Sequence, residues 1–388
     1  MDTTPLLSGR KDPVAPRRSR LSFVSESEFA CLHPTLRRFE CSNGHCVYNG
    51  YATGQQDEPD RSGNKQSVVG VLFSHGFGAN ALSFEALMAY LEAHRAEFGS
   101  LNMATHDAYG FGYSTTLGTD HEKDDGFLDA ISLYKNGRDA GASVVKEVIQ
   151  PKLGEDPLVF VGHSMGSITA MSAACAMREE GYAVRAVVLV APAILAGQTT
   201  KNPASMSHFH HATSFVIRVI FHLIYGLCFL PCRALSRAIL KMSFSTLVSI
   251  PCFWSWALHA VFYFKTGYPS AKTTCQYSIA AKKEGWTDHL ADFVEAHIWN
   301  DSRSPPPQSM HEQFSSLLAS GIKILIVHSE DDLLVPVGNS QKLYEQFREC
   351  RGGEGLIYES VRGKGHLPHE ADLEEFGTLL LKHGIFFP

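Results

Sequence analysis

The segment Gly162-His163-Ser164-Met165-Gly166 constrains the fold of this chain more than any other. It follows an apolar run, residues 157–161, that predicts a buried strand, and it precedes an alanine-rich stretch, residues 167–177, that predicts a helix. A strand that turns directly into a helix holds the serine at the turn in a strained backbone conformation. Glycines two residues before and after leave the space that such a turn needs. We therefore expect Gly162 and Gly166 to permit the turn and Ser164 to act as a nucleophile.

Two backbone amides near this turn are candidate donors to a negatively charged oxygen. The N–H groups of the first helical turn have no partner within the helix and lie at its positive end, so we assign the amide of Met165 to this role. A second apolar strand-like run, residues 68–73, leads into the segment 74–80. There we assign the amide of Phe77, with Gly76 allowing the close approach of the backbone.

A serine hydroxyl also needs a histidine that accepts its proton and a carboxylate that orients this histidine. The strand-like run 322–327 ends at Glu330, Asp331 and Asp332, and any of the three could supply the carboxylate. After another strand-like run, residues 356–361, two glycines precede His366, as a base carried on a loop requires. His369 is the alternative base, and we expect it only to face solvent near the start of the last helix.

The order of these motifs along the chain, serine then carboxylate then histidine, resembles the α/β-hydrolase superfamily from about residue 36 to the C-terminus. The resemblance implies an α/β fold with a mostly parallel central sheet flanked by helices and a helical cap inserted after the sixth strand. It also implies that Asp332 is the acid, because two residues and then Val-Pro follow it, which is the usual form of this loop in enzymes with the same turn. Glu330 and Asp331 are then solvated neighbours.

A closer resemblance is to serine α/β-hydrolases of plants, algae and cyanobacteria, carried by residues 187–194, by 283–286 and by Phe293. The His163-Ser164-Met165 sequence is instead similar to monoacylglycerol lipases and carbon-carbon bond hydrolases. Epoxide hydrolases and haloalkane dehalogenases resemble the chain at residues 75–77, but their nucleophile is an aspartate. Ser164 therefore argues against both of those chemistries.

Charge patterning divides the chain into four parts. No acidic residue lies between Glu180 and Glu284, whereas residues 196–283 contain nine lysines and arginines. This basic and apolar stretch is predicted to be the cap. The predicted parts are a disordered tail at 1–30, the first part of the hydrolase core at 31–195, the cap at 196–305 and the second part of the core at 306–388.

The cap sequence predicts apolar helices with narrow polar stripes. One helix is expected at 215–230, a second carries Arg233, Arg237 and Lys241 at spacings of four, and a third run at 246–264 is broken by Pro251. The helices could line an acyl pocket, lie in the interface of an anionic membrane, or span it. The interfacial arrangement is favoured, because charges make these segments poor spans. An apolar roof over the site favours apolar or amphiphilic substrates.

Composition narrows the remaining classes of function. Nine cysteines without C-x-x-C spacing and no signal-type segment favour a reducing compartment, so we expect an intracellular protein, cytoplasmic or at the cytoplasmic face of a membrane. The net charge of -6 and the absence of a nucleic-acid motif exclude nucleic-acid binding. The histidines at 208–211 lack nearby cysteine or acidic ligands, so we expect neither a metal nor a cofactor. The oligomeric state stays open.

Together these features predict a serine hydrolase that acts on carboxylic esters of apolar or amphiphilic compounds, like an esterase or lipase, with an acyl-enzyme intermediate. Two alternatives remain. A carbon-carbon bond hydrolase of the same fold uses the same three residues, and some α/β-hydrolases are ligand receptors with slow turnover. Because all three reactive positions are filled, an inactive receptor is disfavoured but a slow enzyme is not.

Overall fold

A computed structural model gives the fold of the chain and describes the core of the molecule. The described residues are 36–41, 46–50, 68–108, 111–112, 140–150, 156–194, 233–250, 253–261, 273–274, 277–278, 281, 286–287 and 310–387. The predictions for the tail at 1–30, the histidines at 208–211, the helix at 215–230 and the cap boundary at 305 lie outside these residues.

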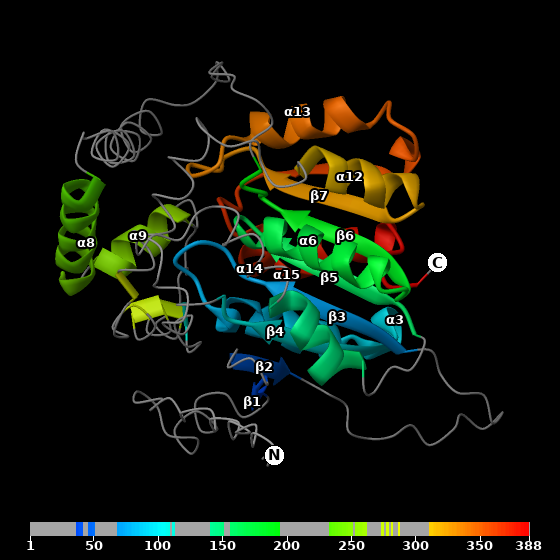
Figure 1. The fold of residues 1–388 in the computed structure, drawn as a ribbon, viewed down its shortest axis with the longest axis horizontal. Coiled ribbons are helices and arrows are strands. Elements are labelled where there is room, and N and C mark those ends of the chain that lie inside the picture. The colour runs from blue at the N-terminus through cyan, green and yellow to red at the C-terminus, as the bar shows by residue number, and fades with distance from the viewer. Residues whose placement is uncertain are drawn as a thin grey trace, which may run out of the picture.

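Within the described ranges, eight strands form one sheet in the order β1-β2-β4-β3-β5-β6-β7-β8 (Figure 1). β2 runs antiparallel to both β1 and β4. The remaining six strands of this order, β4-β3-β5-β6-β7-β8, are parallel to one another. The predicted fold class, a mostly parallel sheet flanked by helices, is confirmed. The strands are β1 (Leu36–Glu40), β2 (Cys46–Gly50), β3 (Val68–Ser74), β4 (Ser100–His106), β5 (Leu158–His163), β6 (Val184–Val190), β7 (Lys323–Ser329) and β8 (Leu356–Val361).

The central strands are apolar on both sides because helices cover both faces of the sheet. Alternate residues of one strand belong to different cores: Leu72 and Phe160 lie in one, whereas Val71 and Val159 lie in the other. The first core is closed by η3 (Val145–Ile149), α6 (Gly166–Glu179), α12 (Met310–Ala319) and α13 (Val337–Phe347). The second is closed by η1 (Ala81–Phe84), α2 (Glu85–Ala93), α3 (Arg95–Phe98) and α15 (Leu373–Lys382).

Helices α8 (Arg233–Ser249) and α9 (Phe253–Val261) lie apart from these layers, at the left in Figure 1, in the segment between β6 and α12. The predicted run at 246–264 is wrong at its start, because residues 246–249 complete α8. Helix α8 ends at Ser249 and α9 begins at Phe253, and between them stands Pro251, which cannot donate the backbone hydrogen bond that a continuous helix needs. Among the described residues, no helix is both long enough and apolar enough to cross a membrane.

Candidate active site

Ser164 lies between β5 and α6 with a φ of +52°. This left-handed conformation is strained for a residue with a side chain. Both backbone groups of Ser164 are held by hydrogen bonds: its amide donates to the carbonyl oxygen of Val190 over 2.8 Å, and its own carbonyl oxygen accepts from the amide of Ala193 over 3.2 Å. The end of β6 and the residues after it therefore keep the serine in its strained turn.

The glycines on either side of this serine lie in contacts that leave no room for a side chain. A Cβ atom at Gly162 would overlap the backbone at Gly166 and Ser167, and one at Gly166 would overlap the carbonyl oxygens of Ser74 and His75. The first turn of α6 therefore rests directly against the end of β3.

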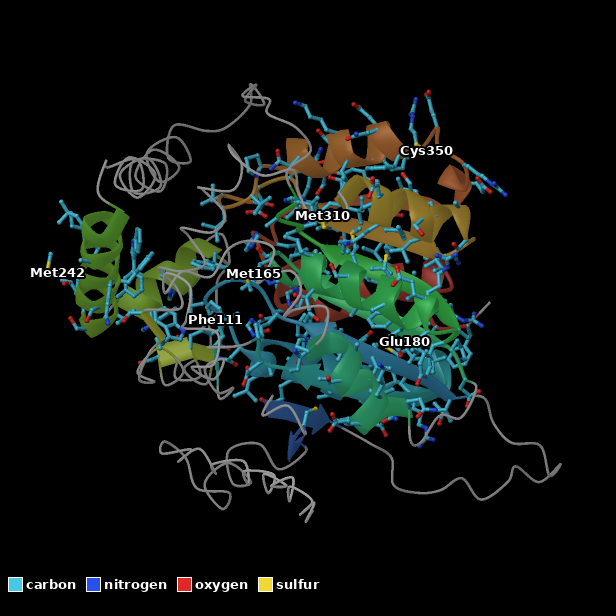
Figure 2. All side chains as sticks on the ribbon, viewed as in Figure 1. Phe111, Met165, Glu180, Met242, Met310 and Cys350 are labelled. Atoms are coloured by element: carbon cyan, nitrogen blue, oxygen red, sulfur yellow. The ribbon has the colours of Figure 1, made fainter. Side chains whose placement is uncertain are left out.

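The two predicted oxyanion donors come from different segments, the residue before α6 and the loop after β3. Met165 immediately precedes α6, and among the described residues its amide donates no hydrogen bond. Phe77 lies in the loop after β3, where its exposed ring contacts Phe111 at 6.2 Å between ring centroids. A Cβ at Gly76 would come within 3.0 Å of Ser164 Cβ, so this loop passes directly beside the serine. Figure 2 shows Met165 and Phe111 on the side of the sheet that faces α9.

His75 braces the same loop. Its Nδ1–H donates to the carbonyl oxygen of Gly76 over 2.8 Å, and its Nε2 accepts from the amide of Ala108 over 2.9 Å. Burial lowers the pKa of His75, which favours this neutral form. The imidazole therefore ties the loop after β3 to the loop after β4.

Asp332 is buried and accepts hydrogen bonds at both carboxylate oxygens. Oδ2 lies 2.6 Å from Nδ1 of His366 and 3.1 Å from Nε2 of His328, and Oδ1 accepts from the amides of Leu334 and Val335 over 2.8 and 3.0 Å. Burial raises the pKa of this carboxyl, but the charges and hydrogen bonds of His366 and His328 outweigh it and hold the pKa well below its usual value. Because the carboxylate carries no proton, His366 must donate from Nδ1, and Nε2 of the neutral ring is left as an acceptor.

His328, at the end of β7, is a residue that the sequence analysis missed. Its Nε2 faces two acceptors, Asp332 Oδ2 and the carbonyl oxygen of Val335 at 3.0 Å, so this nitrogen must carry a proton. Its Nδ1 lies 2.6 Å from Oγ of Ser340. His328 is thus a positioning residue for Asp332. The only hint of this role in the sequence is that His328 stands four residues before Asp332.

The two other acids of this loop do not contact His366 in the described part of the chain. Glu330 is ion-paired with Arg362 at 2.6 Å and fits the expected solvated neighbour. Asp331 is half-buried, accepts from the amide of Gly363 over 3.1 Å and contacts Oγ of Ser329. The prediction that Asp331 is merely solvated is wrong, because these contacts brace the loops after β7 and β8.

His366 is held between the serine turn and α9. Its carbonyl oxygen accepts from Nε2 of His163 over 2.9 Å, and the two rings lie 4.7 Å apart between centroids. Its amide donates to the carbonyl oxygen of Val261 over 2.8 Å. Within the described residues, no hydrogen bond joins His366 to Oγ of Ser164.

The prediction that His369 faces solvent is wrong. The residue lies in α14 (Pro368–Ala371), which packs against η1, and its side chain is fully buried. Its ring lies 4.7 Å from that of His163 and 4.8 Å from that of Phe84. Burial, with a smaller contribution from His366, lowers the pKa of His369 to about 3. A neutral His369 therefore packs beneath the serine turn.

Glu370 is buried beside Tyr277, which comes from the segment between β6 and α12. The two side chains share a hydrogen bond, and Oε1 of Glu370 has no hydrogen-bond partner among the described residues. Burial raises the pKa of Glu370 to about 8, although the bond to Tyr277 opposes the shift. The carboxyl is therefore mainly protonated at neutral pH.

A sequence profile of the alpha/beta hydrolase family matches residues 71–377. The chain belongs to the alpha/beta hydrolase family. Among solved structures, it is similar to an esterase from Exiguobacterium antarcticum, with 15% identity, a TM-score of 0.52, and coverage of 89% of this chain and 98% of that one. It is also similar to a putative lipase from Acinetobacter baumannii AYE, with 12% identity, a TM-score of 0.52, and coverage of 97% and 99%.

A third similar structure is the Cif epoxide hydrolase from Acinetobacter nosocomialis, with 13% identity, a TM-score of 0.51, and coverage of 90% of this chain and 88% of that one. No curated protein matches the sequence. At these identities the structures share the fold alone with this hydrolase. The predicted superfamily is confirmed, whereas the closer resemblance to plant, algal and cyanobacterial members stays a prediction.

The contact at Gly166 predicts a specific loss of stability. We expect Gly166→Ala to lower the free energy of unfolding by about 1–3 kcal/mol. The new Cβ would overlap the carbonyl oxygens of Ser74 and His75, and these backbone atoms cannot shift unless the end of β3 shifts with them. Gly338→Ala, in the first turn of α13, is the matched control, since a Cβ there meets no atom within 4 Å. Urea unfolding of both variants measures the difference, and equal stabilities would contradict the contact.

The buried carboxyl of Glu370 predicts a pH dependence of stability. The folded state keeps its proton up to about pH 8, whereas an unfolded glutamate loses it near the ordinary value of 4.5. Stability is therefore lost as the pH rises through this window, by at most about 1.4 kcal/mol per pH unit. A glutamine at position 370 cannot ionise, so the variant should not lose stability in this way. Denaturant unfolding at several values of pH should show the advantage of Glu370→Gln over the wild type growing up to about pH 8, and a constant difference would refute it.

Proposed function

We propose that this alpha/beta hydrolase is a serine hydrolase that cleaves carboxylic esters of apolar or amphiphilic compounds. The observation that carries the proposal is the buried bond of 2.6 Å between Asp332 Oδ2 and His366 Nδ1, on a loop tied to the serine turn through His163. A strained serine next to a histidine that an ionised carboxylate orients is the arrangement that acyl transfer needs.

In the first half of the reaction, Oγ of Ser164 attacks the acyl carbon while Nε2 of His366 takes the hydroxyl proton. Asp332 keeps the proton on Nδ1, so that Nε2 is free to accept, and stabilises the imidazolium that forms. The amides of Met165 and Phe77 donate to the oxyanion of the tetrahedral intermediate. Collapse of the intermediate expels the alcohol, which takes its proton from Nε2, and leaves the acyl group on Oγ.

In the second half, water attacks the acyl-enzyme. His366 takes a proton from this water, and the same two amides stabilise the second oxyanion. Collapse releases the carboxylic acid and returns the proton to Oγ of Ser164. The cycle requires a hydrogen bond between Ser164 and His366 when substrate is bound, and catalytic hydrogen bonds of this kind often tighten only in that complex.

The surroundings of these residues favour apolar substrates. Leu367, next to His366, belongs to an apolar cluster with Ala79, Leu258 and Tyr277, and Phe111 belongs to a second one with Ala281 and Trp286. A polar ligand that bound among these side chains would lose its hydration without gaining hydrogen bonds in exchange. The indole N–H groups of Trp254 and Trp286 have no acceptor among the described residues, which suits a ligand that carries a few oxygen atoms.

Ser164→Ala tests the nucleophile. We expect at least a thousandfold loss of hydrolysis of p-nitrophenyl and monoacylglycerol esters and loss of labelling by a fluorophosphonate, on the order expected for removal of a nucleophile that acts together with a base. Ser172→Ala is the matched control: this buried serine lies in α6, the helix that follows Ser164, and donates to Gln313 over 3.1 Å. Full labelling of the Ser164 variant would end the proposal.

The wild type separates the remaining possibilities in the same assay. Labelling without multiple turnover of any ester would contradict an esterase and leave a carbon-carbon bond hydrolase or a slow receptor. Product analysis and single-turnover kinetics distinguish those two.

Asp332→Asn tests the assignment of the acid. The amide cannot hold the proton on Nδ1 of His366 in the same way, so we expect kcat to fall by about 10³ to 10⁴. Asp331→Asn is the matched control, since Asn keeps an oxygen that accepts from the amide of Gly363, and kcat should change little. The opposite ranking would move the acid to Asp331.

A further inference from the structure

Large exposed hydrophobic side chains gather on one part of the described surface. Six are exposed, and four of them lie on α8, just after it, or on α9: Leu235, Met242, Ile250 and Trp256. We call these four residues the outer face. Met242 is 63% exposed, and Figure 2 shows it pointing away from the sheet. Monomeric proteins rarely leave such side chains clustered on one element without a partner.

The two sides of α8 differ in what they contact. Phe244 and Val248 pack against the cluster that contains Phe111 and Trp286. The exposed positions of α8 include 235, 238, 242, 245 and 249, at intervals of three and four residues, and also 241 and 246. The spacing of the first five places them on one side of a helix. The first half of this side carries Leu235, an alanine and Met242, so α8 exposes an apolar stripe while a second apolar side holds it to the molecule.

Helix α9 connects the outer face with the candidate active site. Its Trp256 is exposed, whereas Leu258 is buried in the cluster that contains Leu367. The carbonyl oxygen of Val261, its last residue, accepts from the amide of His366 over 2.8 Å. A surface that binds the outer face would therefore be connected to His366, the predicted base, through one short helix, α9.

The charge of this region determines the kind of partner. The chain has no acidic residue from 181 to 283, α8 carries Arg233, Arg237 and Lys241, and the side chain of Lys241 is exposed. A basic segment without acidic residues that exposes Leu, Met and Trp matches a phospholipid surface that offers negative head groups above an apolar layer. A lipid layer also accepts protruding side chains without a preformed groove on either partner.

We propose that the outer face binds to the surface of an anionic phospholipid membrane, with α8 and α9 lying in the interface. The inference rests on the proposed function, because it names the source of substrate: esters dissolved in that membrane would reach Ser164 past α9. Each basic residue near an anionic surface contributes attraction, and the apolar side chains add the burial that makes binding persist.

The experiment is flotation of the full-length protein with phosphatidylcholine vesicles prepared with and without phosphatidylserine. We expect the wild type to float with the anionic vesicles and the double change Leu235→Glu with Met242→Glu to reduce binding at least about tenfold. Leu381→Glu is the matched control. Leu381 is also an exposed hydrophobic residue, 39% exposed, but it lies on α15, so this variant should bind like the wild type.

A second variant tests the charges. Changing Arg233, Arg237 and Lys241 together to glutamate should reduce binding to anionic vesicles at least about tenfold, and high salt should weaken the wild type in the same direction. Equal binding of the wild type to vesicles with and without phosphatidylserine would overturn the proposal.

Hydrolysis of a soluble p-nitrophenyl ester separates this proposal from the proposed function. All these variants should retain the activity of the wild type, because none alters the candidate active site. If the wild type hydrolyses the ester but does not float with the vesicles, the proposal of membrane binding is refuted and the proposed function stands. Self-association that depends on Leu235 and Met242, without flotation, would identify the outer face as a contact between copies and would likewise overturn it.

Discussion

The contact between the first turn of α6 and the end of β3 is the constraint on which the site depends. The carbonyl oxygens of Ser74 and His75 lie against Gly166 so closely that only glycine fits there. Because α6 starts in this contact, the chain must leave β5 in a turn that gives Ser164 its positive φ. A strained residue persists only where its surroundings hold it firmly. Here the hydrogen bonds to Val190 and from Ala193 do so, and within the described part of the chain the amide of Met165 donates no hydrogen bond.

The position of His366, the proposed base, depends on the same contact through a chain of hydrogen bonds. His163, in the serine turn, donates to the carbonyl oxygen of His366, so the loop after β8 is positioned from the strand that leads to Ser164. Asp332 then orients the ring, and His328 holds the second position around Oδ2 of Asp332. Burial of this network makes each bond stronger and also makes any unpaired member costly, so the geometry has few alternatives.

Local patterns predicted the strands β3, β5, β7 and β8 and the serine turn, because each of these strands is a short apolar run that ends at a glycine or at polar residues. The same patterns failed at His369 and Glu370, which look like ordinary polar residues at the start of a helix. Their burial depends on Phe84 and Tyr277, which are distant along the chain, and no local spacing reports such a contact. His328 was missed for a related reason: a histidine at the end of a buried strand reads as core until its bond to Asp332 is seen.

The fold leaves the chemistry open, since similar structures include both an esterase and an epoxide hydrolase. In this chain, α9 links the exposed surface to the candidate active site. Its exposed Trp256 and the backbone bond from Val261 to His366 lie on one helix of nine residues. A helix this short moves nearly as a rigid body, so a displacement at Trp256 would shift the carbonyl oxygen of Val261 and with it the backbone of His366. Whatever fixes α9 in place therefore also helps to fix the position of the residue that we propose as the base.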